Sequence, residues 1–249
     1  MLQDKSNMLK VTVGIVTFNA AKTLELTLQS IICQTYRNIE IIVIDGGSND
    51  GTQNILSRYK NIITYWHSKK DKGIYDAMNM VSDRSQGDFL IFLGCDDTFY
   101  NDTVIEDFVS KTKVDYKKVY YGDVFLLNEK RRYDGSFSSY KLALRGLSHQ
   151  AIFYPKCLYK KFKYDLKYRY WADYYLNIFL WGRYGAFQRM ELLVANFNQD
   201  GQGSTNVDQL FLDDKLKHVF ECLGILPASL VLLQRIKQKI FGNALTILK

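Results

Sequence analysis

Short apolar runs alternate with segments of helical periodicity over the first hundred residues. Near-continuous, β-rich apolar runs at 11–18, 39–44, 62–66 and 89–93 predict strands buried on both faces of a parallel sheet. Between them, apolar side chains recur at the spacing of amphipathic helices, at Leu24, Leu28, Ile31 and Thr35, at Ile55, Leu56 and Tyr59, and at Ile74, Ala77, Met78 and Val81. Asn19 is placed to cap the first of these helices. This order predicts an α/β fold built from βαβ units with right-handed crossovers.

The alternation stops after residue 100. The later pattern predicts a short helix at 101–111, two strands in a meander at 118–127 and 131–137, and a third strand at 150–154. A longer helix at 171–182, a further strand at 186–197 and a helical tail from Val207 follow. We therefore expect a smaller mixed half to follow the parallel one.

Polar side chains follow three of the predicted strands at the point where each strand ends. Thr17 and Asn19 follow the first strand, Asp45 follows the second, and Asp96 and Asp97 follow the fourth. Open α/β sheets bind ligands beyond the carboxyl ends of their strands. The sequence therefore predicts a binding site at this edge of the sheet.

Asp96 and Asp97 are adjacent carboxylates after a buried strand. Neighbouring side chains on extended chain point apart, so one could ligate a metal while the other bonds a ribose hydroxyl or a metal-bound water. Hard oxygen ligands suit Mg²⁺ or Mn²⁺, which take one or two carboxylates together with substrate phosphates. The alternative is a turn in which Asp97 caps the next helix.

Four other residues carry two interpretations each. Asp45 precedes Gly-Gly, a turn signal, but its place at a strand end favours hydrogen bonds to a base or ribose. Lys72 opens the third helix and is either solvated or in contact with a phosphate at the positive helix end. Asp173 lies among aromatic residues, as a helix cap or as a carboxylate kept for proton transfer. His149 precedes a predicted strand, and its role, structural or catalytic, stays open.

Positive charge is concentrated in the middle of the chain. The net charge is +7, and the segment 111–170 contains fifteen Lys or Arg against five acidic residues. Such a segment suits an anionic partner such as phosphate or acidic lipid. No zinc-finger or RNA-binding signature is present, which argues against nucleic acid. The four cysteines are far apart in sequence, so a reducing, cytoplasmic compartment is expected.

No apolar run reaches the ~18 residues that a membrane span requires, and residues 1–10 lack the pattern of a secretory signal. The tail at 224–249 instead combines apolar clusters with Arg235, Lys237 and Lys239. A basic amphipathic helix of this kind can lie on a membrane surface. Packing on the domain, or a homodimer contact, fits the same pattern.

Five segments together resemble family 2 glycosyltransferases of the GT-A fold: VTVGIVTFNA, IEIIVIDGGSNDGT, DKGIYDAMN, GDFLIFLGCDD and ADYYL. They occur in the family's order and spacing, most like bacterial transferases that assemble O-antigen, capsule or exopolysaccharide repeats. The resemblance implies a parallel-dominated sheet flanked by helices. It also implies a nucleotide-sugar-binding half at 1–100, an acceptor-binding half with the catalytic base at 101–205, and a basic helical tail at 206–249.

The resemblance also implies roles for single residues. Those expected to hold the nucleotide are Thr17, Asn19 and Asp45, with Asp45 on the base. Asp97 would be the metal ligand, Asp96 a contact to ribose or to metal-bound water, and Asp173 the catalytic base.

The chain departs from the family pattern at three places. Cys95 stands where some members have the first Asp of D-x-D, so metal binding would rely on Asp96 and Asp97. Met78 precedes Asn79 where many members have Arg, and Lys72 would supply the missing positive charge. Ala172 stands where a Glu usually precedes the base.

The implied reaction is an inverting transfer of a hexose or N-acetylhexosamine from a nucleotide-diphosphate sugar, with UDP favoured, assisted by Mn²⁺ or Mg²⁺. The implied acceptor is a saccharide on undecaprenyl diphosphate, used in O-antigen, lipopolysaccharide or capsule synthesis at the inner face of the cytoplasmic membrane. The alternative is a non-catalytic nucleotide-sugar-binding or scaffold protein of a polysaccharide assembly complex. A sugar nucleotidyltransferase would need a Gly-rich, Arg-bearing loop after the first strand, where this chain has Thr-Phe-Asn-Ala.

Overall fold

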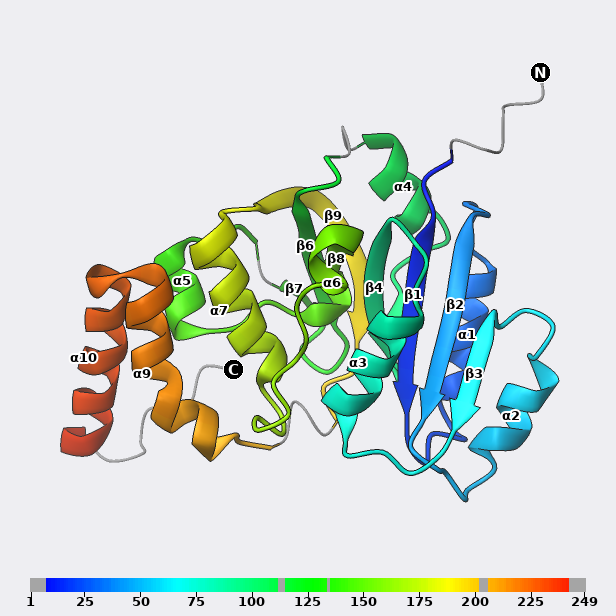
Figure 1. The fold of residues 1–249 in the computed structure, drawn as a ribbon, viewed down its shortest axis with the longest axis horizontal. Helices are drawn as coiled ribbons and strands as arrows, with labels where there is room; N and C mark the ends of the chain where they lie inside the picture. The colour runs from blue at the N-terminus through cyan, green and yellow to red at the C-terminus, as the bar shows by residue number, and fades with distance from the viewer. Residues whose placement is uncertain (1–7, 112–114, 134, 202–205, 242–249) are drawn as a thin grey trace.

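The computed structural model describes residues 8–111, 115–133, 135–201 and 206–241. Four parallel strands in the order β3-β2-β1-β4 build the first half. They are β1 (Val11–Thr17), β2 (Ile39–Asp45), β3 (Tyr65–Ser68) and β4 (Phe89–Gly94), and the helices between them are α1 (Leu24–Ile32), α2 (Thr52–Arg58) and α3 (Ile74–Arg84). The predicted alternation and the parallel pairing are confirmed (Figure 1).

Three local predictions in this half are wrong. Asn19 does not cap α1, because the helix begins at Leu24 with Thr23 at its N-cap. The same helix ends at Ile32, short of Thr35, whose amide donates instead to the carbonyl of Asp102. The third strand was expected at 62–66 but begins at Tyr65, because the amides of residues 62 and 63 donate to Tyr59 O and continue the turn that ends α2.

The sheet continues without a break into the second half. Beside β4 lies β8 (Ile152–Pro155), antiparallel, then β6 (Val119–Leu126), antiparallel, and then β9 (Phe187–Phe197), which is parallel to β6. Two short strands complete it, β5 (Thr98–Phe99) beside β9 and β7 (Arg131–Tyr133) beside β6. The result is a mixed, mostly parallel sheet of nine strands within the described chain, as expected for the fold class.

Element boundaries in this half differ from the prediction where turns intervene. The strand expected at 131–137 ends at Tyr133; residue 134 lies outside the described residues, and the amide of Phe137 donates to the hydroxyl of Tyr121. The strand expected at 150–154 begins as a 3-10 turn, η2 (His149–Ala151). The short helices α5 (Ser139–Leu144) and α6 (Lys156–Tyr159) were not predicted, because four to six residues are too few to show helical periodicity.

Helices cover both faces of the sheet and enclose two apolar cores. One core lies under α1, α2 and α4 (Val104–Lys111), and the other lies under α3, α5 and α7 (Ala172–Tyr184). The helices α9 (Gln209–Leu223) and α10 (Ile225–Phe241) pack onto α7 and α5, at the end of the molecule far from β3 (Figure 1). Among the residues described, no helix is both long and apolar enough to cross a bilayer.

Candidate active site

The carboxyl ends of β1, β2, β3 and β4 meet at one edge of the sheet, as predicted. The register places Thr17 beside Asp45, Asp45 beside Ser68, and Val16 beside Gly94. In Figure 1 the arrowheads of β1, β2 and β3 point to this edge. The Thr17 hydroxyl is buried at the end of β1 and interacts with the thiol of Cys95, in the turn after β4. A direct contact between Thr17 and a nucleotide stays a prediction.

The Asp45 carboxylate is fully buried at the end of β2. It accepts hydrogen bonds from the Ser48 amide at 2.9 Å, from the Ser68 hydroxyl at 2.5 Å, and from the Ser48 hydroxyl. A carboxylate offers about four acceptor positions, so about one is left for a ligand. Asp45 therefore holds the turn after β2 against the end of β3, and its contact with a nucleotide base stays a prediction.

Asn19 joins the loops that follow β1 and β2. The backbone amide of Asn19 donates to Ser48 Oγ at 2.7 Å, and its side-chain Oδ1 accepts from the backbone amide of Asn49 at 3.1 Å. Its φ of 51° lies in the left-handed region that asparagine tolerates better than most residues. These contacts shape the floor of the expected nucleotide site, and a direct contact between Asn19 and the nucleotide stays a prediction.

The loop between β3 and α3 closes over the end of β2. A Cβ built on Gly46 would lie 3.1 Å from Asp71 Oδ2, so the absence of a side chain at Gly46 permits this close approach. Burial, together with the charges of Asp76 and Asp45, raises the pKa of Asp71. Lys72 is exposed in the same loop and forms no ion pair within the part of the chain that is described. The sequence pattern had singled out Lys72 but not Asp71.

Asp96 and Asp97 lie in a tight turn rather than on extended chain. The Asp97 amide donates to Gly94 O at 3.1 Å, and the next element is the strand β5, so Asp97 caps no helix. The expectation that the two side chains point apart is wrong. A Cβ built on Gly94 would lie 2.5 Å from Asp97 Oδ2 and 3.0 Å from Asp96 Oδ1, so both carboxylates lie against this glycine.

The Asp97 carboxylate is buried, with 1% of the residue exposed. It accepts hydrogen bonds from Gln150 Nε2 at 2.9 Å, from the Asn198 amide at 2.9 Å and from the Gly94 amide at 3.1 Å. Burial and the charge of Asp96 raise the pKa of Asp97 to about 6, and burial also raises the pKa of Asp96. Two acids held together in a buried turn form a place that a cation would stabilise.

The acidic pair fits a hard divalent cation. Burial and the charge of Asp96 raise the pKa of the Cys95 thiol to about 11. A hard cation prefers the carboxylate oxygens of Asp96 and Asp97 to this sulfur. Among the described residues, no three acidic, histidine or cysteine side chains gather into a complete metal cage. Two carboxylates without a cage are the donor set of Mg²⁺ and Mn²⁺ sites that rely on substrate phosphates for further ligands.

Three elements converge on Asp173, in the first turn of α7. Its Oδ1 accepts from the Tyr75 hydroxyl of α3 at 2.7 Å and from the Tyr174 amide at 2.8 Å. Its Oδ2 lies 3.1 Å from Nδ1 of His149, in η2. Burial raises the pKa of Tyr75 well above its usual value, so Tyr75 remains a donor. Asp173 is thus a partly exposed carboxylate held in one orientation.

The turn η2 connects the acidic pair with Asp173, through two adjacent side chains. His149 contacts Asp173, and Gln150 donates to Asp97. Burial alone would lower the pKa of His149, but the hydrogen bond with Asp173 and the charges of Asp173, Asp97 and Asp96 raise it. The sequence left His149 undecided and did not suggest Gln150. The only available signal was two adjacent polar residues before a buried strand.

A groove of about 1060 Å³ opens beside Asp173. Its walls come from the β6–β7 hairpin, from α5 and the start of α7, and from α9 and α10. Its lining mixes aromatic and basic side chains, among them Trp171, Tyr174, Lys215 and Arg235. A groove of this size beside an oriented carboxylate is suited to bind a substrate.

Comparison with known proteins shows the family of this chain. The model of the family "Glycosyl transferase family 2" matches residues 12–176. A "PGL/p-HBAD biosynthesis glycosyltransferase" of Mycobacterium tuberculosis is 35% identical over 206 residues, which cover 79% of this chain and 80% of the relative. An uncharacterized glycosyltransferase of the same organism is 42% identical over 96 residues, which cover 38% of this chain and 37% of the relative.

Solved structures show the same fold. The structure of TarS from S. aureus aligns with a TM-score of 0.69 at 14% identity, covering 96% of this chain and 46% of TarS. The complex of TarS 1–349 with UDP-GlcNAc aligns with a TM-score of 0.70 at 15% identity, covering 95% of this chain and 74% of that one. This chain thus spans less than half the length of TarS, and at such identity the likeness concerns the fold. The sequence matches, which include the strand ends, the acidic pair and Asp173, show that this chain belongs to glycosyl transferase family 2.

Proposed function

We propose that this protein is an inverting glycosyltransferase that moves a hexose or N-acetylhexosamine from a nucleotide-diphosphate sugar to a saccharide acceptor. One observation carries the proposal: η2 links Asp173, beside an open groove, to the acidic pair at the binding edge of the sheet. One turn thus contacts both the proposed base and the proposed site for the leaving group.

The reaction is a single in-line displacement at the anomeric carbon. The acceptor oxygen forms the new bond to this carbon while the bond to the nucleotide diphosphate breaks, and the proton of the acceptor hydroxyl passes to Asp173. Hydrogen bonds from Tyr75 and the Tyr174 amide, with the contact to His149, hold Asp173 in position. No second carboxylate is required as a nucleophile, in contrast to a retaining hydrolase.

The nucleotide of the donor and the metal ion are assigned to different residues. Thr17, Asn19, Asp45 and Lys72 would hold the nucleotide, and Asp97 with Asp96 would hold Mn²⁺ or Mg²⁺. The ion, when bound, would neutralise the developing charge on the diphosphate leaving group. The place of Thr17 beside Asp45 at the strand ends and the convergence of both carboxylates at Gly94 support these assignments.

UDP is the favoured nucleotide, because the similar fold of TarS has been solved with UDP-GlcNAc. The proposed acceptor is a saccharide on undecaprenyl diphosphate, used in the synthesis of bacterial surface polysaccharide such as O-antigen or capsule. The basic segment 111–170 supports an anionic acceptor.

A panel of nucleotide sugars tests this function. We expect a UDP-sugar with Mn²⁺ to raise the melting temperature more than GDP-mannose does, because a ligand that binds only the folded state stabilises it. Transfer to a lipid-diphosphate saccharide should follow, with inversion at the anomeric carbon by NMR. Binding of the nucleotide sugar without transfer to any saccharide would support the alternative, a non-catalytic binding or scaffold protein.

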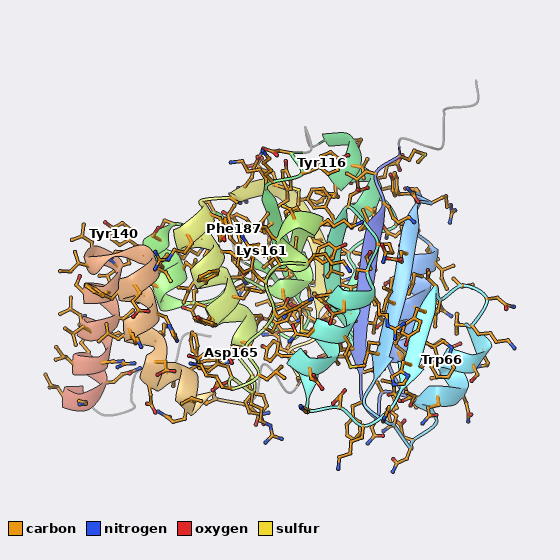
Figure 2. All side chains as sticks on the ribbon, viewed as in Figure 1. Trp66, Tyr116, Tyr140, Lys161, Asp165 and Phe187 are labelled. Atoms are coloured by element: carbon orange, nitrogen blue, oxygen red, sulfur yellow. The ribbon has the colours of Figure 1, made fainter. Side chains whose placement is uncertain are left out.

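We further propose that α10 contacts an anionic membrane surface. The exposed apolar residues of this helix include Ile225, Leu226, Leu233 and Ile240. Side chains of α10 project outward at the end of the molecule far from β3 (Figure 2). We expect flotation with anionic but not with neutral liposomes, and its loss in the double variant Leu233→Glu, Ile240→Glu. Equal flotation of this variant would exclude the membrane contact. Concentration-dependent dimerisation of the wild type, lost in the variant, would assign the face to a second copy.

A further inference from the structure

The groove beside Asp173 has one wall to which the proposed reaction gives no role. It is formed by α9 and α10, which contribute apolar and cationic side chains together. Two of the cations that line this wall are Lys215 from α9 and Arg235 from α10. We call them the cation pair.

Lys215 is buried, with 7% of the residue exposed. Its Nζ donates to the carbonyl of Leu144 at 3.0 Å and lies 5.0 Å from the centroid of the Tyr174 ring. Lys215, Tyr174 and the proposed base Asp173 line the same groove. Burial, and secondarily the charge of Arg235, lowers the pKa of Lys215 to about 8.

Arg235 is half-buried and directs its guanidinium at α9. It donates to the backbone carbonyls of Leu212 and Asp213. Neither member of the cation pair forms an ion pair with a carboxylate within the described ranges. Lys239, one helical turn beyond Arg235, lines the same groove. Burying like charges without a counter-ion is unfavourable, and a bound anion would remove this cost.

Each of the three acids that line the groove has a partner. Glu129 pairs with Arg131 at 2.5 Å, Asp173 contacts His149, and Asp213 Oδ1 accepts a hydrogen bond from Gln209 Nε2 at 2.8 Å. The exposed apolar side chains of Leu232 and Ile236 lie on the same wall as the cation pair. The groove therefore offers positive charge beside an apolar surface, which is complementary to an amphiphilic anion.

We propose that Lys215 and Arg235 form an anion subsite that binds the phosphate or diphosphate group of the acceptor, whose apolar part lies on Leu232 and Ile236. The inference rests on the proposed function, because it assigns the anion to the acceptor deprotonated by Asp173. The phosphates of the donor are assigned to the acidic pair and therefore do not account for these cations.

Two acceptors that differ only in charge test the subsite. One carries a saccharide on a decyl chain through a diphosphate, and the other carries the same saccharide through a neutral ether. We expect the wild type to prefer the diphosphate in kcat/KM. In Arg235→Gln, and in Lys215→Met, this preference should fall about 10- to 100-fold, the size of a charge-assisted hydrogen bond. Arg235→Lys, which keeps the positive charge, should retain part of the preference for the diphosphate acceptor.

Lys237→Gln is the matched control, because Lys237 is exposed on the same helix and does not line the groove. It should keep the wild-type preference. An equal loss of kcat/KM on both acceptors in Arg235→Gln would overturn the subsite. Arg235 would then stabilise the groove without distinguishing a charged acceptor from a neutral one.

A binding measurement separates the subsite from the reaction. Fluorescence of Trp171, which lines the groove, reports binding of decyl diphosphate, inorganic pyrophosphate or a neutral decyl glycoside without donor. We expect decyl diphosphate to bind most tightly and to weaken in Arg235→Gln. Binding of decyl diphosphate no tighter than that of the neutral glycoside would overturn the subsite, and equal affinity for pyrophosphate would overturn its apolar part. If decyl diphosphate binds as expected while no saccharide is glycosylated, the subsite stands and the proposed function fails.

Discussion

Replacing Asp173 with asparagine is expected to lower kcat for sugar transfer by about 10²–10⁴-fold, the range of general-base assistance. The amide keeps the size of the carboxylate, and its oxygen can still accept from Tyr75 and from the Tyr174 amide. It cannot take the proton of the acceptor hydroxyl. Single-turnover transfer at saturating donor measures the loss, and calorimetric titration with the UDP-sugar should show wild-type donor affinity.

Two further variants define the role of Asp173. Glu191→Gln removes a carboxylate that is 89% exposed and pairs with Arg189, and it should leave kcat unchanged. His149→Gln should give an intermediate loss of about 10-fold, because Asp173 then keeps the bonds from Tyr75 and the Tyr174 amide but loses one orienting contact. Wild-type kcat in Asp173→Asn would show that another group takes the proton.

Asp97→Asn is expected to weaken Mn²⁺-dependent binding of the UDP-sugar by more than about 100-fold, since even the outer-shell partners of a metal are worth 10–100-fold in affinity. The affinity for the UDP-sugar is measured with Mn²⁺ and with EDTA. The ratio of these two affinities should approach one in the variant. Donor affinity in EDTA should change little, because Thr17 and Asp45 lie at other strand ends.

Asp97→Asn also has a structural consequence that must be measured separately. The asparagine side chain has one accepting oxygen, whereas the backbone amides of Asn198 and Gly94 donate to different oxygens of Asp97, so the new NH2 group faces one of these backbone donors in either orientation. We expect a loss of about 1–3 kcal/mol in the free energy of unfolding, measured by urea denaturation without metal.

Asp96→Asn tests the division of labour between the two acids. Asp96 is the more exposed of the pair, whereas Asp97 already accepts three hydrogen bonds. If Asp97 is the principal ligand, Asp96→Asn has the smaller effect on Mn²⁺ dependence. A full loss in Asp96→Asn beside a retained response in Asp97→Asn would reverse the two roles.

The parallel half of the fold follows from local patterns. Continuous apolar runs mark β1, β2 and β4 because a strand covered on both faces by helices has no solvent side. The predictions that failed concern turns, where one backbone hydrogen bond decides the outcome: the residues after Tyr59 continue a helical turn, and Asp96 and Asp97 close a turn onto Gly94. Such bonds leave no periodic trace in the sequence.

By itself, the sequence determined the class of the sheet and the edge at which Thr17, Asp45 and the acidic pair meet, because parallel strands in register bring their carboxyl ends together. Only the tertiary structure decided how that edge is connected to Asp173. The link depends on His149, Gln150 and Tyr75, whose partners lie 24, 53 and 98 residues away in sequence. The tertiary structure also decided that α9 and α10 complete the groove beside Asp173. Contacts over such separations depend on how whole elements pack, which local periodicity does not record.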